Sequence, residues 1–252
     1  MEETHKNQAP KGVLGHLHPL SQVILKITQI FEEMGFTVAD GNEIETEFYN
    51  FDALNIPEHH PARDMQDTFW LKPLSARKLL RTQTSAVQVH YMENHKPPIR
   101  IISPGKVFRN EATDTTHEAH FYQLEALVVD KGISVAHLKW TLETLFEKLF
   151  EKKMTVRLRP SYFPFTEPSF ETDMTCFKCG GTGCSTCKGT GWIEIGGSGM
   201  VHPKVLENVG IDPKKFSGFA FGYGIDRILM LKYGVEDVRL LYQGDVRLSS
   251  QF

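Results

Sequence analysis

The sequence contains few cysteines, no long apolar run and no excess of positive charge. Its 4 cysteines all fall between Cys176 and Cys187, which excludes the disulfide framework of a small secreted protein. No apolar stretch reaches the ~20 residues that span a bilayer. The polar start, Met1 to Lys11, lacks the apolar segment of a signal peptide. These absences predict a soluble, cytoplasmic protein with no membrane partner.

The charge balance also excludes one way of binding nucleic acid. The chain has 28 Lys and Arg against 31 Asp and Glu, a formal net charge of -3. Chains that bind nucleic acid through overall charge are usually basic. An RNA partner would therefore have to contact local patches or a second subunit. The 252 residues, 40% of them hydrophobic and 23% charged, are ordinary for a globular protein.

Helix and strand patterns follow one another without the regularity of βαβ units. Residues 1–12 are predicted to form a loose tail and residues 13–252 one domain. Apolar spacing and capping residues predict four helices, at His18–Met34, Ser85–His95, Ser134–Leu149 and Ile225–Tyr233. Shorter strands are predicted at Phe36–Ala39, Leu79–Thr82, Met154–Arg159, Trp192–Ile195 and Phe219–Phe221.

Two longer strands set the expected fold class. Residues 99–109 and 119–129 are apolar, and a polar loop separates them, so they predict a long antiparallel hairpin. Hairpins with helices between them are typical of an α+β protein, in which a mostly antiparallel sheet is flanked by helices. We therefore expect that architecture.

The four cysteines form two CxxC pairs, Cys176/Cys179 and Cys184/Cys187. Four thiolates complete the tetrahedral shell of a structural Zn²⁺ ion and leave no open position for catalysis. The alternatives are reduced free thiols or a redox pair, and the close spacing of four cysteines favours metal over both. The sequence predicts a zinc-binding insertion at residues 176–190, at the rim of the sheet. The short gap between the pairs allows slight strain in the site.

Several polar residues fall in segments that otherwise have the pattern of buried strands. Arg109 and Glu111 end one strand, and Gln123 and Glu125 share a face of the next, two residues apart. Arg227 begins a helix directly after a Gly-x-Gly turn. Arginine offers a planar fork that suits phosphate, and glycines before a helix let N–H groups approach an anion. These residues are candidates for a nucleotide site.

Each candidate also has a simpler explanation when taken alone. Arg109 could form a surface ion pair with Glu111, and Glu125 could be a buried acid with all its hydrogen bonds made. Phe163-Pro164-Phe165 could be plain core. His59 and His60 are more simply loop residues than metal ligands.

The order of these pieces resembles the catalytic domain of class II aminoacyl-tRNA synthetases. More narrowly, residues 14–252 resemble the α subunits of bacterial-type phenylalanyl-tRNA synthetases. The resemblance rests on a series of ordered strings: NFDALNIP (50–57), HPAR (60–63), DTFW (67–70), RTQTS (81–85), VFRNE (107–111), QLE (123–125), FPFTEP (163–168), GMVHP (199–203) and GFAFG (218–222). CxxC pairs like these are similar to those of some bacterial members.

For ATP, the resemblance implies the following roles. Arg109 would hold the α-phosphate, and Glu111 would accept from the adenine amino group. Phe121 would stack on adenine, with Arg227 on its other face and also near the γ-phosphate. The remaining ATP-binding residues would be His117, near the pyrophosphate, and the turn glycines Gly222 and Gly224.

For phenylalanine, the resemblance implies a second set of contacts. Ser85, Gln123 and Glu125 would surround the ammonium group, with Trp70 nearby. Phe163 and Phe165 would pack against the substrate ring. Ala220 would form the floor of the pocket, and Glu167 would bind Mg²⁺.

The resemblance implies ATP-dependent activation of phenylalanine and its transfer to tRNA(Phe). The partner would be a β subunit, in an assembly of two α and two β chains. Family members begin with a long helical arm, and this chain has almost nothing before Leu14. That departure keeps a second hypothesis open, a stand-alone paralogue that makes an aminoacyl-adenylate without charging tRNA by itself. A third is a module that has lost chemistry and uses the cysteines to contact RNA.

Overall fold

A seven-stranded sheet is the central feature of the computed structural model, which describes residues 15–60, 63 and 68–252. The predicted tail at residues 1–12 lies outside these residues. The strand order is β1-β4-β5-β9-β8-β7-β6. The strands are β1 (Thr37–Val38), β4 (Ile99–Phe108), β5 (His120–Asp130), β9 (Ser217–Gly224), β8 (Trp192–Val201), β7 (Thr166–Thr175) and β6 (Val156–Phe163).

The sheet is antiparallel throughout except at one edge. Only the short β1 runs parallel to its neighbour β4, and the other five pairings are antiparallel. The long hairpin β4–β5 pairs Ile99 with Val129 at one end and Phe108 with His120 at the other. The predicted α+β class with a mostly antiparallel sheet is therefore confirmed.

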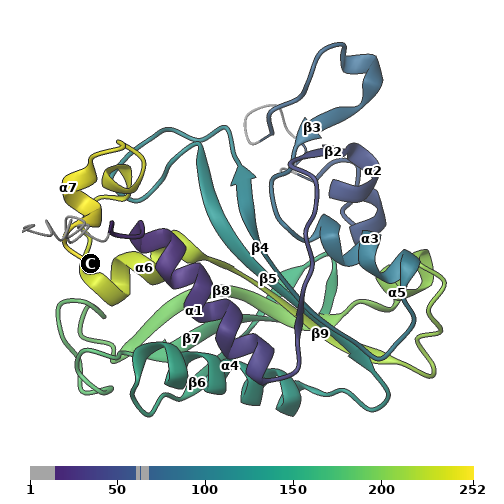
Figure 1. Ribbon diagram of the computed structural model, residues 1–252. Coiled ribbons are helices and arrows are strands. Elements are labelled where there is room, and N and C mark those ends of the chain that lie inside the picture. The colour runs from purple at the N-terminus through teal and green to yellow at the C-terminus, as the bar shows by residue number, and fades with distance from the viewer. Residues whose placement is uncertain (1–14, 61–62, 64–67) are drawn as a thin grey trace, which may run out of the picture.

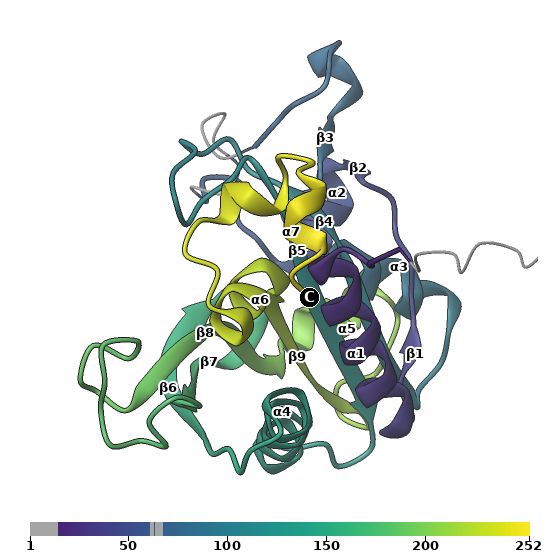
Figure 2. The ribbon, with the colours of Figure 1, turned by 60° about the vertical axis from the view of Figure 1, so that its left-hand side comes forward.

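Two long helices cover one face of the sheet, α1 (Pro19–Glu33) and α4 (Val135–Phe150) (Figure 1). Figure 2, turned by 60°, shows both helices on the same side. Their apolar stripes, which include Ile27 and Phe146, pack on Phe219 and other residues of the sheet. Burying each such side chain stabilises the fold by about 2 kcal/mol. α6 (Ile225–Tyr233) joins this layer directly after β9.

Shorter elements cover one end of the opposite face. They are α2 (Glu47–Asn50), η1 (Asp52–Leu54), α3 (Ala86–Asn94), α5 (Pro203–Asn208) and the two-stranded sheet of β2 (Ile44–Thr46) with β3 (Lys78–Leu80). The short η3 (Leu74–Ala76) has no buried residue and takes no part in this cover. Here Leu127, Val129 and Ala220 of the sheet are apolar and buried. The same face becomes polar further along β5, at Gln123 and Glu125, which leaves room for a cavity.

The C-terminal part follows α6 with η4 (Val238–Leu241) and α7 (Val246–Ser249). Both lie at the end of the molecule where the β4–β5 hairpin turns (Figure 1). In the part of the chain that the structure describes, no helix has the length and apolar character needed to cross a membrane.

Most predicted elements are present, and two local expectations need correction. The strand β7 was not predicted, because its sequence TEPSFETDMT is largely polar and contains Pro168. It is ordered by its two neighbours, β6 and β8. Ser85 does stand before α3, but its side chain forms no cap. Its side chain is instead buried.

Candidate active site

A cavity of about 690 Å³ opens on the polar end of this face. Its floor is formed by β5, β8 and β9, and its walls by the turn between β6 and β7 and by residues 82–85. A cavity of this size suits a drug-sized ligand. The residues predicted to bind substrate that line this first cavity are Ser85, Arg109, Glu111, Phe121, Gln123, Glu125, Phe163, Phe165, Ala220, Gly222 and Gly224.

Strand register brings the polar residues of the floor together. Glu125 lies opposite Gly222, and Gln123 lies opposite Gly224. Gly222 in turn pairs with Gly197 of β8. A Cβ at Gly222 would come within 2.6 Å of the Gln123 amide nitrogen, so glycine is needed there for both polar side chains to lie flat over β9. Both glycines line the cavity.

Glu125 is buried among neutral donors. The amide of Gln123 donates to one carboxylate oxygen at 2.9 Å, and the amide of Gln88, from α3, donates to the other at short range. Burial raises the pKa of Glu125 to about 8, although the hydrogen bonds from Ser85, Gln88 and Gln123 oppose the shift. The carboxyl group is therefore poised to ionise when a cation enters the cavity.

An aromatic wall faces the polar floor. The rings of Phe163 and Phe165 lie nearly parallel, with centroids 6.0 Å apart. Phe163 lies against Gly197, where an added Cβ would come within 2.7 Å of the ring. Ala220 lies opposite Leu127 on the same face of the sheet and is buried. Phe163 and Phe165 are therefore more than plain core, because both line the cavity together with Ala220.

A second cavity, of about 920 Å³, adjoins the first. The two share Arg109, Glu111, Phe121 and Gly224. Arg227 lines the second cavity, and so does His117, whose Nδ1 lies 3.0 Å from a carboxylate oxygen of Asp114. Arg109 and Arg227, 118 positions apart in the sequence, thus line one continuous space.

The guanidinium of Arg109 contacts a backbone carbonyl, an aromatic ring and a carboxylate group. Its Nε donates to the carbonyl of Thr82 at 3.3 Å, and its carbon lies 5.1 Å from the centroid of the Phe121 ring. The nearest oxygen of Glu111 is 3.9 Å from an Arg109 nitrogen. An exposed pair at this distance contributes little. The ion pair with Glu111 is present, but it does not account for the position of Arg109 in the lining of both cavities.

The four cysteines converge at the tip of the loop between β7 and β8. All four Sγ atoms lie within 4.8 Å of one another. The closest pairs are 3.7 Å and 3.8 Å apart, which excludes disulfides. Tetrahedral zinc with bonds of about 2.3 Å places its sulfurs about 3.8 Å apart. Backbone N–H groups of Gly183 and Gly191 also donate to Sγ atoms, so the residues present fit a metal without strain.

Comparison with known proteins places this geometry in a family. A family model described as "tRNA synthetases class II core domain (F)" matches residues 5–252. A relative from Clostridium beijerinckii, named phenylalanine--tRNA ligase alpha subunit, is 56% identical over 242 residues, which are 96% of this chain and 70% of the relative. The chain belongs to this class II family. A relative of the same name from Bacillus subtilis is 57% identical over 241 residues, 95% of this chain and 69% of the relative.

A solved class II structure shares the fold. The crystal structure of pyrrolysyl-tRNA synthetase from Desulfitobacterium hafniense matches with a TM-score of 0.63 at 18% identity, and the match covers 90% of this chain and 74% of that one. Identity at this level supports the class II fold alone. It agrees with the predicted sheet and with the helices packed on it.

Two residues that were predicted to belong to the site do not line either cavity. Among the described residues, the cavity linings do not include Trp70 or Glu167. Trp70 pairs with Leu79 in an isolated bridge, and its ring lies 6.4 Å from that of Phe51. Glu167 is exposed near the start of β7. Their predicted roles stay predictions.

Other residues at the site were missed by sequence reasoning. Gln88 is buried on α3 and contacts Glu125. In the sequence, the only indication of this role is that Gln88 is polar and follows Ser85 by three positions, on the same face of the helix. His60 was predicted to be a simple loop residue, and it lines the first cavity. The others that line this cavity without having been predicted include Ile56, Thr82, Gln83, Tyr162 and Gly197. Their place depends on pairings distant in sequence.

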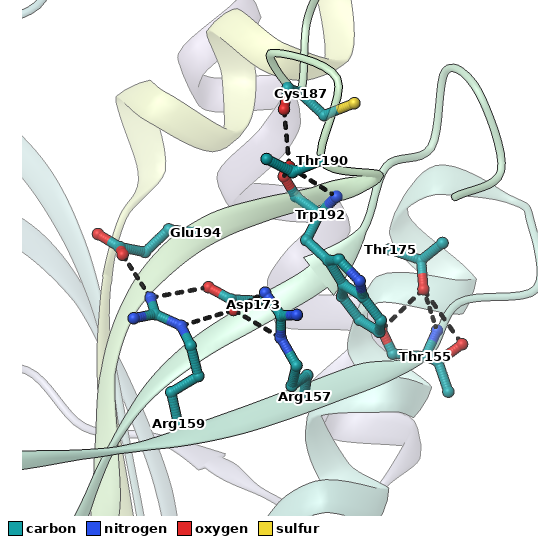
Figure 3. A network of polar contacts seen from close by, with 9 residues as sticks. All are labelled: Thr155, Arg157, Arg159, Asp173, Thr175, Cys187, Thr190, Trp192 and Glu194. Carbon is teal, nitrogen blue, oxygen red and sulfur yellow. Dashed lines mark hydrogen bonds and ion pairs between the residues drawn. The ribbon is translucent and has the colours of Figure 1, made fainter. Parts of the chain in front are cut away.

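An ion-pair network joins β6, β7 and β8 near the cysteine loop (Figure 3), with Asp173 buried and its charged partners largely exposed. Asp173 of β7 accepts from Arg157 and Arg159 of β6, with nearest distances of 2.7 Å. Arg159 also pairs with Glu194 of β8, and the carbonyl of Glu194 accepts from Nε of Arg227 at 3.1 Å. The network therefore joins three strands, and through Glu194 it also contacts Arg227, which lines the second cavity.

Proposed function

We propose that this chain is the catalytic alpha subunit of a phenylalanine--tRNA ligase. It activates phenylalanine with ATP and transfers it to tRNA(Phe). The observation that carries the proposal is 56% identity over 96% of the chain to a protein of that name. The cavity that joins Glu125 to Arg109 supports it. We also propose that the chain works in the cytoplasm with a beta subunit, as two alpha and two beta chains.

The nucleotide half of the site consists of the residues around the two arginines. We assign Phe121 and Arg227 to the two faces of adenine and Glu111 to its amino group. Arg109 holds the α-phosphate, and its fork stabilises the charge that develops on phosphorus. Gly222, Gly224 and His117 complete the ATP-binding set, since all three line the cavities.

The amino-acid half consists of the polar floor and the aromatic wall. Glu125, Gln123 and Ser85 contact the ammonium group, while Phe163 and Phe165 pack against the ring over Ala220. A hydroxyl on the ring would be buried there without a partner, which selects against tyrosine. Trp70 is assigned a place near the ammonium group, although it does not line the cavity.

The reaction needs no protein nucleophile. The carboxylate of phenylalanine attacks the α-phosphorus, the bond to the bridging oxygen breaks, and pyrophosphate leaves. The chain contributes by holding both substrates in line and by neutralising phosphate charge. Mg²⁺ supplies further neutralisation when it is bound with ATP. Glu167 is the residue proposed to bind Mg²⁺, and no step is assigned to it.

Phenylalanine-dependent exchange of pyrophosphate into ATP tests the activation step, and charging of tRNA(Phe) tests the transfer. With the beta subunit present, we expect both. The alternative, a stand-alone paralogue that makes the adenylate without charging tRNA, predicts exchange with no charging under the same conditions. Absence of exchange with the beta subunit present would refute both.

We propose that residues 176–190 form a zinc-binding insertion in which Cys176, Cys179, Cys184 and Cys187 hold structural Zn²⁺. The four thiolates complete the ion's coordination and leave no site for a substrate.

The purified chain is expected to contain about one equivalent of zinc. Cys179→Ser should remove most of it and lower the melting temperature by several degrees, because metal binding stabilises the fold. Elemental analysis and thermal unfolding measure both. Ser185→Ala, a change in the same loop that leaves all four cysteines in place, is the control and should keep its zinc. Less than a tenth of an equivalent in the unaltered chain would refute the site.

Gly222→Ala is expected to weaken phenylalanine binding much more than folding. The new methyl group would collide with the ends of Gln123 and Glu125, which are flexible enough to move aside. We expect KM for phenylalanine to rise about tenfold while unfolding free energy changes by about 1 kcal/mol or less. Exchange kinetics and denaturant unfolding measure the two. Gly15→Ala, where an added Cβ meets nothing within 4 Å and which lies outside both cavities, is the control for KM. Unchanged KM in Gly222→Ala would contradict the assigned floor.

A further inference from the structure

Asp226 is a buried acid directly before Arg227, and no role has been given to it so far. Its side chain is buried at the start of α6. One carboxylate oxygen accepts from the backbone N–H of Tyr122 at 2.7 Å. The other accepts from the hydroxyl of Tyr242 at short range. Both oxygens are thus satisfied by groups from other elements.

These two bonds connect the two sides of the proposed adenine site. Asp226 is bonded to Arg227 along the chain, and Tyr122 is bonded to Phe121. The hydrogen bond from Tyr122 to Asp226 therefore fixes the backbone of β5 against the start of α6 at the point where those two side chains emerge. A change in that bond would change the separation between the Phe121 ring and the Arg227 guanidinium.

The C-terminal segment holds this junction from outside. The ring of Tyr242 packs edge-on against His120, with centroids 4.5 Å apart. The N–H of Val238 donates to the carbonyl of Thr115 at 2.9 Å, in the loop after β4. Tyr242 thus contacts both β5 and α6, and its segment also contacts the loop between Arg109 and Phe121.

We propose that Asp226 and Tyr242 are positioning residues that set the width of the adenine site and so the affinity for ATP. The inference rests on the proposed function. Burial of a carboxyl group costs free energy unless its hydrogen bonds are made, and apolar side chains could fill the same volume for packing alone. The geometry explains why an acid lies here. Its two carboxylate oxygens accept hydrogen bonds from Tyr122, next to Phe121, and from Tyr242, while Asp226 itself is next to Arg227.

The test uses the chain assembled with its beta subunit and measures pyrophosphate exchange for Tyr242→Phe, Asp226→Asn and the double variant. Tyr242→Phe removes one hydroxyl and keeps the ring on His120, so the fold should persist, as thermal unfolding will show. We expect KM for ATP to rise about fivefold in each single variant. The double variant should rise less than the product of the two, because both act through one network.

The KM values of substrates that lack adenine separate a positioning role at the adenine site from a general structural role. KM for phenylalanine and KM for pyrophosphate should stay within twofold of the unaltered enzyme in every variant. Tyr91→Phe, on α3 with its ring against His95, is the matched control and should change none of the three.

Two results would overturn the inference. One is a KM for ATP within twofold in both single variants, and the other is an equal rise of all three KM values, which indicates general loosening. Exchange by the unaltered enzyme is measured first. A failure of the proposed function would therefore appear in the unaltered enzyme, separately from any result with the variants.

Discussion

Arg109→Ala is expected to lower the rate of phenylalanine-dependent pyrophosphate exchange by roughly a thousandfold or more. The side chain lies where the two cavities meet, which is the point at which the phosphates must cross between the adenine and the amino acid. Its positive charge is most strongly used when negative charge builds on the α-phosphate in the transition state. The loss should therefore appear mainly in kcat, with a smaller change in KM for phenylalanine.

The control for this variant is Arg100→Ala, whose exposed side chain lies on β4, the strand that ends just before Arg109. It removes an equal charge outside both cavities and should leave exchange within twofold. Zinc content and melting temperature should be unchanged in both variants, because Arg109 and Arg100 lie outside the apolar core and outside the cysteine loop. Exchange near the unaltered rate in Arg109→Ala would refute its assignment.

Glu125 is expected to make phenylalanine binding strongly dependent on pH. With a pKa of about 8 in the free site, the carboxyl group is mostly neutral at pH 6, and only its ionised form pairs with the ammonium group. The ionised fraction falls from about one half at pH 8 to about 0.01 at pH 6. KM for phenylalanine should therefore rise roughly fiftyfold between pH 8 and pH 6. Exchange kinetics at several pH values measure this.

Glu125→Gln removes the titrating group and keeps its size. We expect KM for phenylalanine to be high in this variant and nearly independent of pH over the same range. Glu207→Gln, with an exposed side chain on α5, is the control and should keep the pH dependence of the unaltered enzyme. A flat profile in the unaltered enzyme would contradict the account of Glu125.

The same group predicts the pH dependence of stability. Folding raises the pKa of Glu125 from 4.5 to about 8. Between these two pH values the folded chain therefore binds a proton that the unfolded chain does not bind. The contribution of Glu125 is fully present below pH 4.5 and is lost as the pH rises through 8. The difference in unfolding free energy between the unaltered chain and Glu125→Gln should therefore shift against the unaltered chain across this window.

Local signals in the sequence were sufficient for much of the fold. The helix at Ile225–Tyr233 has its predicted bounds, since Gly224 precedes it and Gly234 ends it with a φ of 72°. The β4–β5 hairpin has its bounds within one residue of those predicted, because apolar residues dominate both strands. The CxxC pairs identified the four cysteines, which the structure brings together.

Long-range pairing determines what the sequence could not specify. The strand β7 is too polar to be recognised alone, and it forms because β6 and β8 supply its hydrogen bonds. Gln88 reaches Glu125 only because α3 packs over β5, a contact 37 positions apart. The sequence therefore indicates the residues with chemical roles more directly than it indicates the residues that surround them in the cavity. The resemblance to a known family supplied roles that spacing alone did not.

A crystal structure of the assembled enzyme with a non-hydrolysable phenylalanyl-adenylate analogue tests the central claim most directly. We predict the adenine between Phe121 and Arg227, the phosphate beside Arg109, and the benzyl ring against Phe163 and Phe165. An analogue bound with its phosphate away from Arg109, or with its ring outside the first cavity, would contradict the account.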